Sequence, residues 1–240
     1  MKKMKRIITI RKILSILLAV FLLLTAGCAS DTDVNIKRET HNYSLSSAGE
    51  EDGNHDSAES KFLDVQDSMI WYYRPVYWAE EREITKGTSE NLFSPDQTCT
   101  RGEIVTFLWR CLGKTNVDVT LSFKDVSPED YFYDAVKWAV NYQITNGVSL
   151  ESFSPDAFCS RAQIVTFIWR CAQSPSAENA KFTFTDVPEN EFYTQAVRWA
   201  VENHITYGVS ETSFSPESFC TRAEVVTFLY RAVRFFSASE

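Results

Sequence analysis

The chain has 240 residues, a formal net charge of −8 and 44% hydrophobic residues. This length allows one compact domain or a short array of repeats. The acidic balance argues against nucleic acid as a partner, because proteins that bind nucleic acid present a basic face. The first 28 residues contain six basic and no acidic residues, so the remainder of the chain carries −14.

The N-terminal 28 residues have the pattern of an export signal. A basic run ends at Lys12, and an apolar stretch follows from Ile13 to Leu24. Small residues directly precede Cys28, as in the lipobox at which bacterial lipoprotein signals are cleaved and the cysteine is lipidated. We therefore predict that residues 1–28 are a lipoprotein signal peptide, that Cys28 is lipidated, and that the protein is extracytoplasmic and membrane-attached. An uncleaved anchor is the alternative, although the apolar run is short for a membrane span.

Residues 29–60 are rich in Ser, Asp, Glu, Asn and Gly and lack apolar periodicity. Such a segment cannot bury enough apolar surface to offset the entropy lost on ordering. We predict that it is a disordered, acidic linker between the membrane and the folded part of the chain.

Three copies of one set of motifs fill the rest of the chain. The phrases "SPDQTCTRGEIVTFLWR", "SPDAFCSRAQIVTFIWR" and "SPESFCTRAEVVTFLYR" begin at Ser94, Ser154 and Ser215. Self-similarity at a fixed period, here about 60 residues, is the signature of a repeat architecture. We expect repeats at residues 61–117, 118–178 and 179–240.

Each repeat is predicted to be a helix, a loop and a second helix. In the second repeat, Ala135, Trp138 and Ala139 share one face of the first helix, and a glycine follows its end. A capping box, Ser/Thr-x-x-Glu/Gln, opens each second helix. These boxes are Thr100 to Glu103, Ser160 to Gln163 and Thr221 to Glu224. Two amphipathic helices cannot close a core alone, so we predict an all-α fold in which the three units pack on one another.

Several residues predict local features of this fold. Trp78, Trp138 and Trp199 could stack on sugars, but at helical spacing among alanines they are better explained as core residues. The serine in each "FSP" precedes a proline and is expected to be extended. Pro75 replaces an alanine in the first repeat, so the first helix there is expected to begin late.

Five cysteines follow Cys28: Cys99, Cys111, Cys159, Cys171 and Cys220. The first four bracket two predicted helices, whose ends lie about 18 Å apart, beyond the reach of a disulfide within one repeat. The odd number leaves at least one thiol unpaired. We expect these cysteines to be small buried hydrophobic residues, with a disulfide between repeats as the alternative.

An arginine stands at the first position of every second helix, at Arg101, Arg161 and Arg222. A cation there is unfavourable because unpaired amides and the helix dipole already supply positive potential. Three such arginines suggest an anionic ligand, which a helix N-terminus and a guanidinium fork can hold together. Alternatively, each arginine pairs with a carboxylate of the "DV" that opens each repeat, and a paired arginine can still receive a ligand. These carboxylates belong to Asp64, Asp125 and Asp186.

In their order, the motifs "F-x-D-V", "A-V-x-W-A", "I-T-x-G", "F-S-P" and "T-R-A-E" resemble the S-layer homology domain in three copies, from Phe62 to about Phe235. The resemblance implies a pseudo-threefold helical assembly whose grooves bind secondary cell-wall polysaccharide, often through an anionic, pyruvylated sugar. It makes the arginine of "T-R-A-E" and the glycine of "I-T-x-G" binding residues. The arginines, the three "DV" aspartates and the glycines Gly87, Gly147 and Gly208 are therefore our candidate ligand-binding residues; the glycines could equally be helix stops.

The repeats differ in how closely they follow the motifs. The third repeat keeps them best, and the first departs most, with Gly102 after its arginine. We therefore expect the groove motif of the third repeat to be the most functional. Gln163 replaces a glutamate in the second repeat but still completes a capping box.

The sequence thus predicts a non-catalytic wall-anchoring module. His41 and His55 lie in the linker, and His204 stands where the other repeats have Glu83 and Gln143, so no metal site or nucleophile is repeated. We expect no catalytic residue, metal or cofactor. The expected partners are secondary cell-wall polysaccharide and, through the lipid, the membrane. The alternative is a scaffold that binds another envelope protein without binding glycan.

Overall fold

The computed structural model describes residues 61–178, 180 and 183–236. It contains three pairs of helices: α2 (Tyr73–Glu81) and α3 (Arg101–Cys111), α4 (Tyr133–Asn141) and α5 (Arg161–Cys171), and α6 (Thr194–Glu202) and α7 (Arg222–Ala232), followed by the 3-10 helix η1 (Val233–Phe235). Over these residues the chain forms isolated β-bridges but no strand, which confirms the all-α fold. The predicted signal peptide with Cys28 and the predicted linker lie outside the described residues.

The second helix of each repeat begins as its capping box predicts. In α3, Thr100 Oγ1 accepts a hydrogen bond from the Glu103 amide at 3.3 Å, and Glu103 Oε2 accepts one from the Thr100 amide at 2.8 Å. The same reciprocal pair caps α5 and α7. Each cap places its arginine at the first helical position, where the sequence predicted it.

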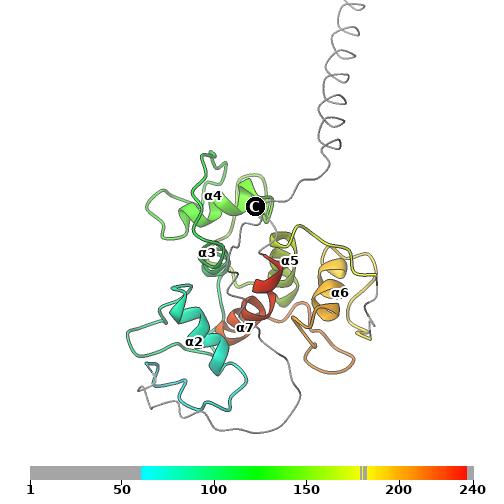
Figure 1. Ribbon diagram of the computed structural model, residues 1–240. Coiled ribbons are helices and arrows are strands. Elements are labelled where there is room, and N and C mark those ends of the chain that lie inside the picture. The colour runs from blue at the N-terminus through cyan, green and yellow to red at the C-terminus, as the bar shows by residue number, and fades with distance from the viewer. Residues whose placement is uncertain (1–60, 179, 181–182, 237–240) are drawn as a thin grey trace, which may run out of the picture. The chain divides into compact units, whose positions relative to one another are not determined.

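Helices of different repeats pack against one another. α3 packs against α4, α5 against α6, and α7 against α2. The second helix of every repeat therefore covers the first helix of the next, and the third repeat closes onto the first. In Figure 1, α3, α5 and α7 surround the centre, with α2, α4 and α6 outside them. This is the expected pseudo-threefold assembly.

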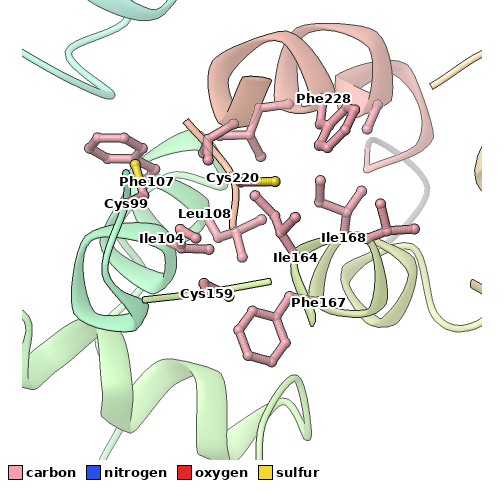
Figure 2. Packing of buried hydrophobic residues seen from close by; sticks show 14 of the residues in the cluster. Cys99, Ile104, Phe107, Leu108, Cys159, Ile164, Phe167, Ile168, Cys220 and Phe228 are labelled. Atoms are coloured by element: carbon pink, nitrogen blue, oxygen red, sulfur yellow. The ribbon is translucent and has the colours of Figure 1, made fainter. Parts of the chain in front are cut away.

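A closed ring of backbone hydrogen bonds lies at the centre of this assembly. The Cys99 amide donates to the Cys220 carbonyl at 3.0 Å, Cys220 donates to Cys159 at 3.1 Å, and Cys159 donates to Cys99 at 3.1 Å. The three side chains are fully buried among apolar residues of α3, α5 and α7, such as Leu108 and Ile164 (Figure 2). Because each cysteine comes two residues before its arginine, the ring also fixes where the three second helices start.

The predicted roles of the tryptophans and cysteines are confirmed. Trp78, Trp138 and Trp199 are at most 9% exposed and belong to the core. The five cysteines after Cys28 are free thiols, three of them buried and two partly buried. Burial raises the pKa of Cys159 to about 12, so this side chain stays uncharged in the core.

Two expectations about helix boundaries are wrong. The first helices do not end at a glycine: α4 closes with hydrogen bonds from Gln143 to Val140 and from Ile144 to Ala139, and Gln143 itself adopts a φ of +59°. Nor does α2 begin late. It starts at Tyr73, which corresponds to the start of the other first helices. Pro75 is tolerated because it is the third helical residue, and the backbone N–H that proline lacks would have no acceptor within the helix at this position.

We expect Cys99, Cys159 and Cys220 to resist iodoacetamide in the native protein and to react together on unfolding. They share one buried ring, and only the thiolate is nucleophilic. Labelling across a guanidinium series, read by peptide mass spectrometry, should give three coincident transitions. Early reaction of one cysteine would show that the ring opens one repeat at a time.

Candidate functional site

The three arginines cross from one repeat into the next. Their side chains are buried, with 2 to 4% exposed. Each Nε donates a hydrogen bond to the phenylalanine carbonyl of the neighbouring "FSP" turn. The pairs are Arg101 to Phe153 at 3.0 Å, Arg161 to Phe214 at 2.9 Å and Arg222 to Phe93 at 2.8 Å. Each junction between repeats, including the one that closes the ring, is therefore bridged by its own arginine.

Aromatic rings enclose each guanidinium. The guanidinium carbon of Arg161 lies 5.0 Å from the ring centre of Phe214 and 5.5 Å from that of Phe228. The other two arginines have equivalent ring pairs at 4.9 to 5.5 Å. A cation over a ring face is stabilised by the ring quadrupole, more strongly where water is excluded. The fork is thus held in a fixed place by rings on two sides and a carbonyl.

The aspartate of each "DV" motif shapes the turn that presents this carbonyl. Asp186 accepts hydrogen bonds from the amides of Phe214 and Ser215, at 2.9 and 2.8 Å, and from Ser213 Oγ at 2.7 Å. Ser215 has a φ of +56°, so the expectation of an extended serine is wrong. A left-handed non-glycine residue costs about 1 to 2 kcal/mol, which the bonds to the carboxylate offset. Asp64 and Asp125 accept the same two backbone hydrogen bonds in their repeats. Asp125 also accepts one from Ser152 Oγ, whereas the first repeat has Leu92 at this position.

The proposed pairing of the arginines with these aspartates is therefore wrong. The aspartate oxygens are occupied by their own turns, and no ion pair joins them to an arginine in the part of the chain that is described. Burial on its own raises the pKa of Asp186, but the hydrogen bonds from Phe214, Ser213 and Ser215 outweigh it, and the pKa lies below its ordinary value.

The carboxylates that do pair with arginines come from the capping boxes. Arg222 Nη1 lies 3.2 Å from Glu103 Oε1, and Arg161 Nη1 contacts Glu224 Oε1. Glu103 thus uses one oxygen to cap its own helix and the other to bind the arginine of the preceding repeat. The sequence predicted the first role of this glutamate but not the second.

The helix N-termini are not open anion sites. The amides of Arg161 and Ala162 donate to the carbonyls of Ser218 and Pro216 at 2.8 and 3.0 Å, and the next amide donates to the capping serine. The other two second helices are bonded in the same way. The expectation that free amides would receive a ligand is therefore wrong. The arginine side chains remain as the groups that can bind an anion.

An open groove of about 280 Å³ adjoins Arg161 at the junction of the second and third repeats. Its walls include Glu224, Arg231 and Gly208 of the third repeat, together with Trp71 of the first. All three repeats therefore contribute to one groove. Its volume is near the lower end of the range for small-molecule sites.

Sequence reasoning missed two of these wall residues. Trp71 is 55% exposed just before the first helix, and Arg231 donates through Nη1 to the Ile205 carbonyl at 3.2 Å. Burial lowers the pKa of Arg231. The signals were present, since an aromatic residue precedes each first helix and an arginine recurs in each second helix. These arginines are Arg110, Arg170 and Arg231.

The glycine in the groove wall is required by the loop, not by a helix end. Gly208 has a φ of +79°, and a Cβ there would lie 2.5 Å from Phe184 Cε1 and 2.6 Å from the Ser213 carbonyl. Gly87 and Gly147 are equally confined. The interpretation as helix stops is wrong, whereas a close approach of ligand to backbone at this loop stays a prediction.

The described residues contain no group of three or more side chains suited to a metal ion. Among the same residues, no helix is long and apolar enough to cross a membrane. The arrangement offers guanidinium forks, aromatic surface and bare backbone at each repeat junction. Such a surface can bind an anionic ligand and hold it in one orientation.

Comparisons with known proteins agree with the repeat analysis. A family model described as "S-layer homology domain" matches residues 61–105, 122–165 and 183–226. Over 162 residues, or 62% of the chain, the sequence is 28% identical to a "Cellulosome-anchoring protein" of Acetivibrio thermocellus. Over 120 residues, or 48%, it is 31% identical to a "Cell surface protein" of Thermoanaerobacter kivui. Over 102 residues, or 42%, it is 34% identical to a "Surface-layer 125 kDa protein" of Lysinibacillus sphaericus. The aligned part spans 34%, 16% and 8% of these relatives, respectively.

We expect Asp186→Asn to lower the free energy of unfolding by about 1 to 2 kcal/mol at neutral pH, because an amide group replaces an acceptor of several hydrogen bonds. The pKa of Asp186 is lowered in the fold, so its stabilising effect is present above the ordinary value, about 3.9, and disappears as the pH falls through the folded value. The difference from wild type should therefore shrink in acid.

Urea denaturation from neutral pH to about pH 2 measures this difference. Asp118→Asn is the matched control, because this exposed carboxylate accepts no hydrogen bond from the described residues. If the difference in free energy of unfolding between wild type and Asp186→Asn stays constant down to the lowest pH, the role assigned to the Asp186 carboxylate is contradicted.

Proposed function

Because the chain belongs to the S-layer homology domain family, we propose that it is a non-catalytic module that attaches to the cell wall by binding an anionic secondary cell-wall polysaccharide. The observation that carries this proposal is the buried guanidinium of Arg161 at the wall of an open groove. Its position is set by the neighbouring repeat, so the folded chain supplies a preorganised cation. Arg101 and Arg222 are the equivalent groups at the other junctions.

The groove suits an acidic sugar better than a simple ion. A carboxylate, such as that of a pyruvylated sugar, can accept hydrogen bonds from the guanidinium fork. The exposed face of Trp71 offers an aromatic surface for the apolar side of a sugar ring, and Gly208 lets the ligand approach the backbone. The aspartates Asp64, Asp125 and Asp186 act as positioning residues, because their oxygens hold the turns.

The names of the relatives support surface attachment, since they describe a cell-surface, a surface-layer and a cellulosome-anchoring protein. We place this protein at the cell wall on that ground. These relatives are much longer than the part that aligns, and their activities as whole proteins are not assigned to this chain.

We expect the full-length chain, in detergent micelles, to bind purified acidic wall polysaccharide in a salt-sensitive way. Binding should fall sharply after chemical removal of the acidic substituents, because the arginines would lose their anionic partner. Calorimetry at several salt concentrations measures both effects. An affinity that does not change with salt or with removal of the acidic substituents would favour the alternative of a protein-binding scaffold.

We expect replacement of Arg101, Arg161 and Arg222 together by lysine to weaken this binding by about 1 to 3 kcal/mol, because lysine keeps the charge but loses the planar fork. Arg198→Lys, at an arginine of α6 that pairs with Glu189 and is not part of the groove lining, is the control and should bind as wild type does. Thermal denaturation of each variant establishes that the fold survives. Undiminished affinity in the folded triple variant would remove the arginines from the binding site.

We also propose that Cys28 is lipidated, so that the protein links the membrane to the wall. This cysteine lies outside the described residues, and the proposal rests on the lipobox-like sequence before it. Mass spectrometry of the detergent-extracted protein should find a lipidated N-terminal cysteine, and Cys28→Ser should abolish both the lipid and the cleavage. An unmodified N-terminus at another residue would contradict this.

A further inference from the structure

The three repeat junctions differ in charge. At two of them, the arginine meets the glutamate of the next capping box, in the pairs Arg161 with Glu224 and Arg222 with Glu103. At the junction of the first and second repeats, Arg101 faces α5, whose capping box has Gln163 at this position. The charge of the partner is absent there, although the backbone arrangement is the same.

The orientation of Gln163 follows from its cap. Its Oε1 accepts a hydrogen bond from the Ser160 amide at 3.2 Å, as the capping glutamate oxygens do in the other repeats. The amide group Nε2 therefore takes the place of the oxygen that binds arginine elsewhere. A donor replaces an acceptor, so this side chain cannot satisfy the guanidinium.

Arg101 is left with unused donors. Its side chain is 4% exposed and donates through Nε to the Phe153 carbonyl, and within the residues that the structure describes Nη1 and Nη2 have no acceptor. By contrast, Arg222 uses Nη1 for Glu103 and Nη2 for Thr85 Oγ1 at 3.0 Å. Among the described residues, the fully buried polar atoms that lack a partner do not include Arg101 Nη1 and Nη2, so these two nitrogens still reach solvent, where a ligand can approach them.

The missing partner has an energetic consequence. Removing an ion from water costs several kcal/mol unless an opposite charge or hydrogen bonds compensate. Burial lowers the pKa of Arg101, and the charge of Asp125 only opposes this shift. The protein therefore leaves a cation that an external anion can stabilise without first displacing a carboxylate.

Other charged groups do not remove this difference. Each junction has a second arginine in the same helix as the capping box, and Arg170 is the counterpart of the groove residue Arg231. Lys86 adds a positive charge at the junction that closes the ring, but its exposed ammonium is solvated and screened by salt. The junction of the first and second repeats alone combines two arginines with a neutral capping residue.

We propose that the junction between the first and second repeats is the strongest site of this protein for a carboxylate, and that Gln163 determines this preference. The ligand carboxylate accepts hydrogen bonds from the free Arg101 nitrogens and from Gln163 Nε2, in the place that a glutamate fills at the other junctions. The inference rests on the proposed function and specifies its main site. It also differs from the expectation from the sequence, in which the third repeat was favoured because it keeps the family motifs best.

The test uses sodium pyruvate as a small carboxylate probe and the full-length chain labelled with ¹⁵N-arginine. The Nε–Hε signal of Arg101 should titrate at a pyruvate concentration about tenfold lower than the signals of Arg161 and Arg222, because one charge-assisted hydrogen bond is worth about this factor. Two near-isosteric variants keep every capping box. Gln163→Glu should remove the advantage of Arg101, and Glu224→Gln should bring Arg161 to the sensitivity of Arg101.

The outcomes separate this inference from the proposed function. Equal titration of the three arginines in wild type, or an unchanged Arg101 titration in Gln163→Glu, overturns the preference. A parallel titration with purified acidic wall polysaccharide tests the function. If pyruvate gives the expected order but the polysaccharide does not bind, the wall ligand is wrong and the anion site stands. If the polysaccharide binds and the order is absent, the function stands without this preference.

Discussion

The hydrogen bond from a buried arginine Nε to a phenylalanine carbonyl of the next repeat is the contact on which the ring depends. It requires the arginine to start a helix, which the capping box ensures, and it requires the carbonyl to face that helix, which the aspartate-held turn ensures. The backbone hydrogen bonds between the three cysteines bring the helix starts and the turns together at the centre. A ring of three such junctions buries apolar faces that a single pair of helices would leave in water. Each motif of the repeat therefore serves a contact with a neighbouring repeat.

This arrangement gives one side chain two roles. Arg161 holds two repeats together and also lines the groove, so replacing it by a small residue would disturb the fold and the site at once. The capping glutamates also affect both the fold and the site, because they pair with the arginine that a ligand would use. A glutamate stabilises the buried cation and competes with an anionic ligand for it. Stability of the junction and affinity of the groove are thus expected to oppose each other at this position.

The sequence was sufficient for the elements of the fold and for the position of the site residues along the helices. Helix periodicity and capping boxes depend on residues close in the chain, so the six helices and the starts of the three second helices could be predicted. Contacts between repeats depend on which copy lies next to which, and three similar repeats do not contain that information. The pairing of Arg222 with Glu103 instead of an aspartate could therefore not be deduced. The left-handed turn at Ser215 was missed for a different reason: the aspartate that compensates for it lies in the same repeat but 29 residues earlier in the sequence.

Repetition also makes it possible to vary one groove without altering the frame. A capping box needs an oxygen that accepts the N-cap amide, and glutamate and glutamine both supply one. The exchange therefore leaves the helix start intact and changes only the atom that faces the arginine of the preceding repeat. The aromatic residue before each first helix varies in the same way: Trp71 lines one groove, and Tyr131 and Phe192 are its counterparts in the other repeats. Three junctions on one backbone can thus differ in charge and in aromatic surface, so a polysaccharide with unequal substituents along its chain would find unequal sites around the ring.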